Sequence, residues 1–474
     1  MNRTPLTESG TGGNPKDNRR WLWLFVAGCA AVILSVILLT FVHWQAQPAA
    51  SEPSLRVTKV SPARGRGDYS GARHFSSNAG LAPSAGEIVA HKLALFVQGR
   101  RELVGRMAEH FKVSVPAEVE QFFKLAEAGN WEELQALFKT IMDRKSGGAR
   151  SEAMLKLWPA VMETYGVIEQ THLWPAQNLL DYGQAVLGSL RPDMVYVGGT
   201  DAGRFIPTLL NDTGEGERHI VLTQNALADG SYLDYVQFLY GDRLQTLTSA
   251  DSQRAFQEYL ADAQRRLQHD QQFPDEPSQI RRGEDIRVTD NRVQVSGQVA
   301  VMGINELLLN ALMQKNPDLS FAMQESFPLP STYVNAAPLG PILELRAPDP
   351  QNALTPEKAA QSLDYWRSMA QQLGSDPASA ETAEPRTAWS QMATAQANLL
   401  ASQNLPGEAE QIYRIAADLS PTSLPPVSQL AEFLARAGRT AEANQLLDSF
   451  AARNASDLQK VEAEKKFLGT LGHN

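Results

Sequence analysis

The chain has 474 residues, with 53 acidic and 43 basic side chains, and its formal net charge at pH 7 is -10. No block of Lys and Arg interleaved with aromatic residues occurs, which argues against a nucleic-acid-binding surface. The sole cysteine, Cys29, excludes an intramolecular disulfide and a thiolate zinc site. About 390 residues follow residue 86, enough for two or three domains of about 100 to 200 residues each.

Residues 21–44 form an uncharged apolar run with Trp21 and Trp44 at its ends. At roughly 1.5 Å per residue a helix of this length reaches about 36 Å, enough to cross a hydrocarbon core of about 30 Å. Basic residues precede the run, whereas the next fixed positive charge after it is Arg56. The positive-inside rule therefore predicts a cytoplasmic tail at residues 1–20 and a single-pass helix whose following chain lies outside.

A cleaved signal peptide is the alternative interpretation, because the small residues Ala46, Ala49 and Ala50 follow the apolar run. The run exceeds the usual apolar region of such peptides, about 7 to 15 residues, so we expect a retained anchor. Either interpretation exports the rest of the chain. We therefore expect an anchor in the bilayer of a bacterial inner (cytoplasmic) membrane, with the main part periplasmic or otherwise extracytoplasmic.

Residues 45–86 are rich in Pro, Gly, Ser and Ala and predict a flexible linker. Residues 87–190 have a helical pattern. Pro116 suits a helix start and Gly129 a helix stop, and Asn130 then begins a second helix whose apolar residues fall on one face. This region is therefore predicted to be helical and to contain a helix hairpin.

The apolar period changes in residues 191–350, where short apolar runs alternate with helix-like stretches such as Gln298 to Gln314. The predicted strands are Met194–Val197, His219–Thr223, Leu319–Met323 and Ile342–Leu345. This alternation predicts an α/β domain with a mainly parallel sheet. A helical connector and linker are expected at residues 351–387.

A glycine-rich turn follows the first predicted strand, and polar residues follow two others. In an open α/β sheet such strand ends meet in a ligand crevice, and N–H groups at a strand-to-helix turn can hold an anion. The alternative is that the glycines only permit the bend. The candidate ligand-binding residues are Gly198, Gly199, Thr200, Asp201, Gly203, Arg204, Thr223, Gln224, Asn225, Glu325 and Ser326. A polar small molecule or a glycan is the expected type of ligand.

Recognised catalytic and metal-binding motifs are missing from the sequence. The eight histidines show no H-E-x-x-H or i, i+4 spacing, and no G-x-S-x-G elbow occurs. We therefore expect no metal and no cofactor, and we assign no catalytic residue. An enzyme with Asp201, Arg204 and Glu325 in its cleft stays an alternative, because the sequence cannot give the distance between the carboxylates.

The C-terminal residues 388–474 contain a periodic pattern of small and large apolar residues. Six positions recur with one offset, 431 minus 397, which is 34; the pairs are Ala397 and Ala431, Leu400 and Leu434, Ala409 and Ala443, Tyr413 and Leu447, Ala416 and Phe450, and Pro421 and Ala455. The pattern resembles the tetratricopeptide repeat (TPR), with two repeats, turn residues Asn404 and Gly438, and an alanine in place of the second closing proline. The resemblance implies that the tail binds a protein or peptide in a concave groove.

The run Arg191-Pro192-Asp193, followed by Val195 to Asp201, resembles loops of bacterial protein-mannosyltransferase-like membrane proteins. Those transferases act through many membrane helices, whereas this chain has one candidate, so the resemblance implies a detached outer domain that binds or assists. We therefore expect a membrane-anchored envelope protein that binds or scaffolds partners. The alternatives are an envelope enzyme acting on glycans, an accessory subunit of a membrane glycosyltransferase, or a sensor whose ligand alters partner binding.

Overall fold

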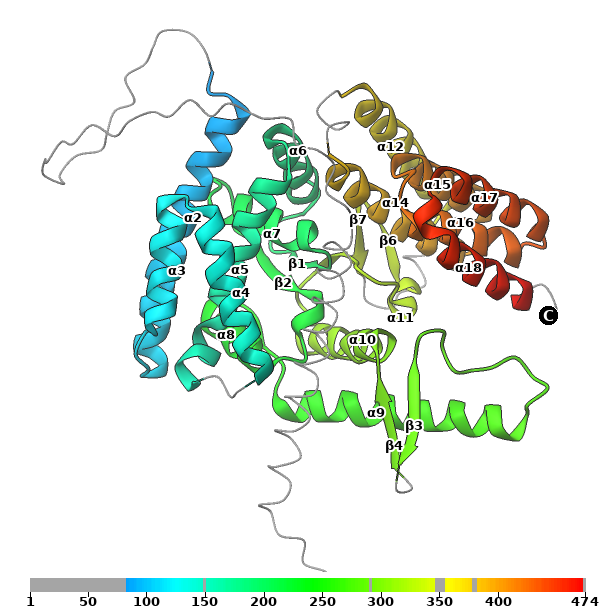
Figure 1. Ribbon diagram of the computed structural model, residues 1–474, viewed down its shortest axis with the longest axis horizontal. Helices are drawn as coiled ribbons and strands as arrows, with labels where there is room; N and C mark the ends of the chain where they lie inside the picture. Colours follow the sequence, from blue (N-terminus) through cyan, green and yellow to red (C-terminus); the bar gives the residue numbers. More distant parts are fainter. Residues whose placement is uncertain (1–81, 148–150, 290–291, 346–353, 377–381, 472–474) are drawn as a thin grey trace, which may run out of the picture.

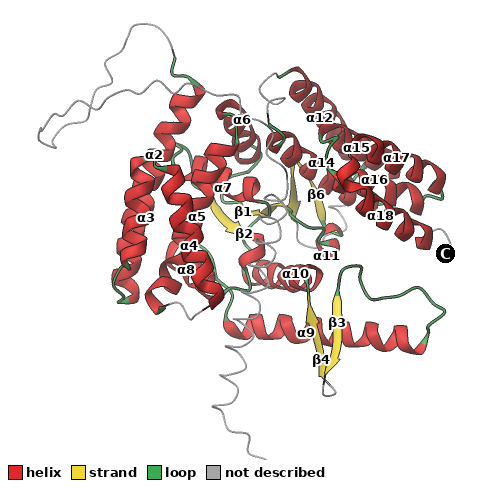
Figure 2. Ribbon diagram, viewed as in Figure 1, coloured by secondary structure: helices red, strands yellow, loops and turns green. Residues whose placement is uncertain are grey.

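The computed structural model describes residues 82–147, 151–289, 292–345, 354–376 and 382–471. The expected cytoplasmic tail, the membrane segment at residues 21–44 and residues 45–81 of the expected linker lie outside these ranges. None of the helices within them combines the length and the apolar character that crossing a bilayer requires. The described chain is mostly helical and surrounds a small mixed sheet (Figures 1 and 2).

The chain before the sheet is helical, as predicted. Its helices are α2 (Ala85–Phe111), α3 (Ala117–Ala128), α4 (Trp131–Gly147), α5 (Glu152–Leu173) and α6 (Ala176–Leu187). Gly129 ends α3 with a φ of 66°, and α4 begins directly after Asn130. The α4 side chain Phe138 is buried and stacks on Tyr165 of α5, with ring centroids 3.7 Å apart. The apolar face of the predicted hairpin therefore packs against α5.

The sheet has the strand order β2-β1-β5-β7-β6. Its strands are β1 (Val195–Gly198), β2 (Ile220–Thr223), β5 (Phe321–Gln324), β6 (Ala336–Leu339) and β7 (Ile342–Leu345). β1 is parallel to β2 and β5, whereas β7 is antiparallel to both β5 and β6. The sheet is therefore mixed, and the prediction of a mainly parallel sheet holds for β2, β1 and β5 but not for the pairings of β7. Only Gly340 and Pro341 separate β6 from β7, and so short a connection can only form an antiparallel hairpin.

Helices cover both faces of the sheet, so side chains alternate between two cores. Tyr196 points into the core shared with α6, α7 and the C-terminal helices, whereas Val195 and Val197 point into the core shared with α8, α9 and α10. The elements of this central part that complete the layers are α7 (Asp201–Asp212), the short η1 (Gln224–Ala226), α8 (Gly230–Tyr240), α9 (Ser249–Gln272), α10 (Gln298–Lys315) and α11 (Pro330–Tyr333). The α10 bounds agree with the predicted helix to within one residue.

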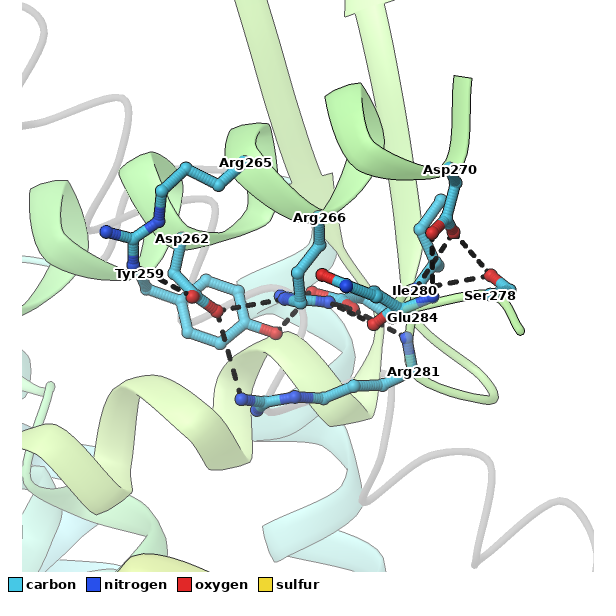
Figure 3. A network of polar contacts seen from close by, with 10 residues as sticks. Tyr259, Asp262, Arg265, Arg266, Asp270, Ser278, Ile280, Arg281 and Glu284 are labelled. Atoms are coloured by element: carbon cyan, nitrogen blue, oxygen red, sulfur yellow. Dashed lines mark hydrogen bonds and ion pairs between the residues drawn. The ribbon is translucent and has the colours of Figure 1, made fainter. Parts of the chain in front are cut away.

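Between α9 and α10 the chain forms a projection that the sequence analysis did not predict. We call residues 273–289 and 292–296 the arm; they contain the antiparallel strands β3 (Asp285–Thr289) and β4 (Arg292–Ser296). Figure 3 shows how Glu284 fastens the arm to α9: its carboxylate accepts hydrogen bonds from Tyr259 Oη at 2.6 Å and Arg266 Nη2 at 2.8 Å. Burial favours a higher pKa for Glu284, but these bonds outweigh it and lower the pKa.

From α15 onward, alternate C-terminal helices start 34 residues apart. After α12 (Pro356–Ser375) come α14 (Glu384–Ser402), α15 (Pro406–Leu419), α16 (Leu424–Arg436), α17 (Thr440–Arg453), the short η3 (Ala455–Asp457) and α18 (Leu458–Leu471). The start of α17 follows that of α15 by 440 minus 406, which is 34, and α18 follows α16 by 458 minus 424, which is again 34. The helices α14 with α15 and α16 with α17 pack as pairs, and α18 packs against both α16 and α17.

The first helix pair is joined to the sheet through the amide of Gln396, which is fully buried. Gln396 Nε2 donates to Gly340 O at 2.7 Å and to Ile342 O at 3.0 Å, and its Oε1 accepts from Ser362 and Trp366 of α12. One side chain of α14 therefore satisfies groups on α12 and on the β6–β7 hairpin together.

Candidate functional site

The predicted site residues gather at the carboxyl ends of β1, β2 and β5, where β1 lies between the other two strands. This is the point where the chain order reverses, the usual place of ligand crevices in open α/β sheets. Asn225 Nδ2 donates to Gly199 O at 3.3 Å and Ser326 Oγ at 3.2 Å, and Ser326 N donates to Gln224 Oε1 at 3.0 Å. Side chains following β2 and β5 therefore meet the glycine-rich turn after β1.

The N–H groups of that turn already have an acceptor within the protein. Gln324, the last residue of β5, is buried, and its Oε1 accepts from Gly199 N at 3.1 Å, Thr200 N at 2.9 Å and Thr200 Oγ1 at 3.2 Å. Thr200 caps α7 by accepting from Gly203 N at 3.0 Å. The amide oxygen of Gln324 thus takes the position that an anion would need. Gln324 is not among the predicted site residues, because a strand residue shows no sign of a contact with a turn over 120 residues away.

Close packing accounts for the glycines of the turn. A Cβ atom on Gly203 would lie 1.9 Å from Gln324 Oε1, and one on Gly199 would lie 2.3 Å from Ser326 N. A Cβ atom on Gly198 would lie 2.6 Å from Gly203 O. Any side chain at these positions would clash with a neighbouring strand or with α7, so these glycines have a structural role, which is close packing and not only the bend.

Asp201 and Arg204 lie together at the start of α7. Arg204 Nη2 donates to Asp201 Oδ1 at 2.7 Å, and the Asp201 side chain is 63% exposed. Glu169 of α5 faces the same pair: burial and the negative charge of Asp201 raise its pKa to about 7, although Tyr165 and Arg204 oppose the rise. Glu169 was not a predicted site residue, because the sequence of α5 does not show that this helix packs beside the start of α7.

Glu325 points away from this group. It is buried, and its Oε1 accepts from Tyr333 Oη at 2.7 Å. Burial raises the pKa of Glu325 to about 8, although hydrogen bonds from Tyr333 and from Asn398 of α14 oppose the rise. Gln324 and Glu325 are successive residues and so lie on opposite sides of the chain. Asp201 and Glu325 are therefore not brought into contact as paired carboxylates.

The remaining predicted residue at the β2 end has a structural contact. Thr223 N donates to Tyr232 Oη at 2.6 Å, which fastens α8 to the strand. Among the residues that the structure describes, no group of three or more His, Cys, Asp or Glu side chains is arranged to hold a metal ion.

A second candidate surface is formed by the first helices of the repeats. Three exposed residues occupy matched positions on α14, α16 and α18 at intervals of 34, namely Gln391, Pro425 and Gln459. The residues three places further along, Thr394, Ser428 and Glu462, are also accessible and lie one helical turn away on the same face. We call these six residues the repeat row. Its first helix borders the α/β unit, because Gln403 Nε2 donates to Tyr333 O at 2.6 Å.

Comparison of the chain with protein-family models, curated proteins and solved structures found no match.

Proposed function

We propose that this protein is a binding or scaffolding component of the bacterial cell envelope, anchored by residues 21–44 and engaging a protein or peptide through a TPR-like array of α14 to α18. The observation that carries the proposal is the constant spacing of 34 residues, which relates helix bounds, turn residues and exposed positions alike. Arrays of this kind create extended concave surfaces that bind partners, and we propose that the repeat row belongs to such a surface.

The contrast between the buried and the exposed residues of the repeats supports a binding role. Ala397, Ala409, Ala431 and Ala443 are fully buried, and small residues at these positions let the paired helices approach closely. The repeat row takes no part in that packing and offers a proline, amides, hydroxyls and one carboxylate to a partner. A largely polar, extended peptide is the partner chemistry that such a surface fits.

The geometry of the α/β unit favours binding over the enzyme alternative. Gln324 occupies the donors of the glycine-rich turn, and Glu325 lies in a different environment from Asp201 and Arg204. A general acid–base pair needs two groups that reach one substrate, and these residues do not form one. If the unit holds a glycan or other polar molecule, the exposed Asp201 is the group that we propose to contact it.

Site-specific photocrosslinking in intact membranes tests the proposal. A photoreactive phenylalanine analogue is placed at Gln391 or Gln459 of the repeat row, and the matched control places it at Gln445, an exposed residue of α17. We expect one discrete adduct from both row positions and none from the control position. Equal adducts from all three positions, or none from the row, would contradict binding at this surface.

A further inference from the structure

A cavity lies beside the amino end of the edge strand β2, whereas the glycine-rich turn follows the carboxyl end of β1. Its volume is about 330 Å³, it is open to solvent on one side, and it is lined by α2, the end of α7, the segment just before β2 and the end of α8. This volume falls at the lower end of the range of small-molecule sites, about 300 to 1,000 Å³. Neither the predicted site residues nor the repeat row contributes to it.

Positive charge dominates the lining. Four arginines line the cavity, Arg100, Arg106, Arg218 and Arg243, against the carboxylates of Glu102 and Asp212. Arg100 bridges two carboxylates, because its Nη2 lies 2.5 Å from Asp212 Oδ2 and 2.7 Å from Glu163 Oε2. Four guanidinium groups therefore face three carboxylates, those of Glu102, Asp212 and Glu163, and within the described residues Arg106, Arg218 and Arg243 form no ion pair.

The wall that carries Arg218 is held rigidly. The buried His219 donates its N–H to Asn211 Oδ1 at 2.9 Å, and Asn211 Nδ2 donates to His219 O at 3.1 Å. Arg243 Nη1 and Nη2 both lie 3.3 Å from Arg218 O. These contacts fix the backbone beside Arg218 and hold the guanidinium group of Arg243 against it before any ligand binds.

The lining also has an apolar part. Leu95 is 48% exposed although it is a large hydrophobic residue, and Phe96 and Leu239 line the same cavity. A small inorganic anion would leave this part uncovered. A ligand with an anionic head and a compact apolar body would cover both parts.

We propose that this cavity binds a phosphate monoester with a small, partly apolar body. Arginine guanidinium groups match the oxygens of a phosphate in bidentate geometry, and several of them around one phosphate favour its doubly charged form. Arg106 and Arg218 hold the phosphate from two sides, and Leu95 covers the body of the ligand. The site is independent of the repeat row.

Isothermal titration calorimetry with the full chain in detergent tests the proposal, using phenyl phosphate, inorganic phosphate and phenol as probes. We expect phenyl phosphate to bind several-fold more tightly than inorganic phosphate, and phenol to give no signal. The double variant Arg106→Gln, Arg218→Gln should weaken phenyl phosphate binding at least about tenfold. The control Arg367→Gln, Arg436→Gln removes the same charge from two exposed arginines elsewhere and should leave binding unchanged.

A third variant separates the two parts of the site. Leu95→Ser should weaken the binding of phenyl phosphate towards that of inorganic phosphate and leave inorganic phosphate unaffected. No binding of phenyl phosphate to the wild type at millimolar concentration would overturn the proposal. Equal losses in the Arg106/Arg218 and Arg367/Arg436 variants would also overturn it, because the effect would then come from net charge alone.

Discussion

Asn404 and Gly438, 34 residues apart, end α14 and α16 in the same way. Both are left-handed, with φ values of 58° and 79°. In each case the next residue closes the turn onto the helix: Leu405 N donates to Leu400 O at 3.0 Å, and Arg439 N donates to Leu434 O at 2.9 Å. The repeat therefore extends to the backbone conformation of single residues.

Replacing Gly438 by alanine should lower the free energy of unfolding by about 1 kcal/mol, because an L side chain is strained at this φ. The space around Gly438 is open, so no clash adds to this cost. Gly407, inside α15, is the control: Gly407→Ala should be stabilising, since alanine favours the helix. Urea denaturation of the full chain measures both changes in the free energy of unfolding. Equal losses of stability in the Gly407 and Gly438 variants would contradict a special role for the left-handed conformation of Gly438.

Replacing Ala443 by tryptophan should overpack the contact between α16 and α17 and cost about 1 to 3 kcal/mol. Ala443 is fully buried, whereas Ala441, two residues earlier on α17, is exposed. Ala441→Trp should therefore have little effect on the melting temperature. If both variants melt like the wild type, Ala443 does not lie at a close helix contact.

Replacing Gln324 by alanine should cost about 1 to 3 kcal/mol, because the N–H groups of Gly199 and Thr200 lose their acceptor. The emptied turn then has donors to offer, so inorganic phosphate should raise the melting temperature of this variant by more than it raises that of the wild type. Gln98→Ala, at an exposed position of α2, serves as the control. Equal stabilisation of all three proteins by phosphate would argue against a vacated anion position.

The raised pKa of Glu325 predicts a stability that falls with rising pH. Its pKa is 4.5 in the unfolded reference and about 8 in the fold, so between these values the folded state binds more protons. The stability that the protonated carboxyl contributes is complete below about pH 4.5 and is lost as the pH rises towards 8.

Glu325→Gln should remove this dependence and stabilise the protein at pH 8 by on the order of 1 to 4 kcal/mol. The exposed Glu462→Gln serves as the control. Melting curves recorded from pH 5 to pH 8.5 provide the measurement. If the melting temperatures of wild type and Glu325→Gln change in parallel with pH, the pKa of Glu325 is not raised.

The apolar segment at residues 21–44 should keep the full chain in the membrane fraction through a carbonate wash. A variant lacking residues 1–44 should be released by the same treatment. Mass analysis of the extracted protein separates the two interpretations of the segment, since a cleaved signal peptide would leave a chain beginning after Ala50. Recovery of the intact wild type in the soluble fraction would refute the anchor.

Features set by local sequence were predicted well. The bounds of β7 agree with the predicted strand, and α10 differs by one residue, because each has a clear apolar pattern between turn signals. Features set by distant contacts were not predicted. The direction of β7 depends on the tight turn at Gly340, and the sequence of β6 contains Pro338, which disfavours a strand. The contact of Gln324 with the turn, likewise, depends on two strands meeting in space.

The hydrogen bonds of the buried Gln396 amide also affect the order in which the C-terminal helices unfold. An array that contacts only its neighbours frays from its ends, but here the first helix shares four hydrogen bonds with α12 and the β6–β7 hairpin. Amide protons of α14 should therefore exchange with solvent as slowly as those of the sheet, and those of α18 much faster. The C-terminal helices should thus unfold one after another. We expect α18 to unfold first and α14, which is bonded to the sheet, to unfold last.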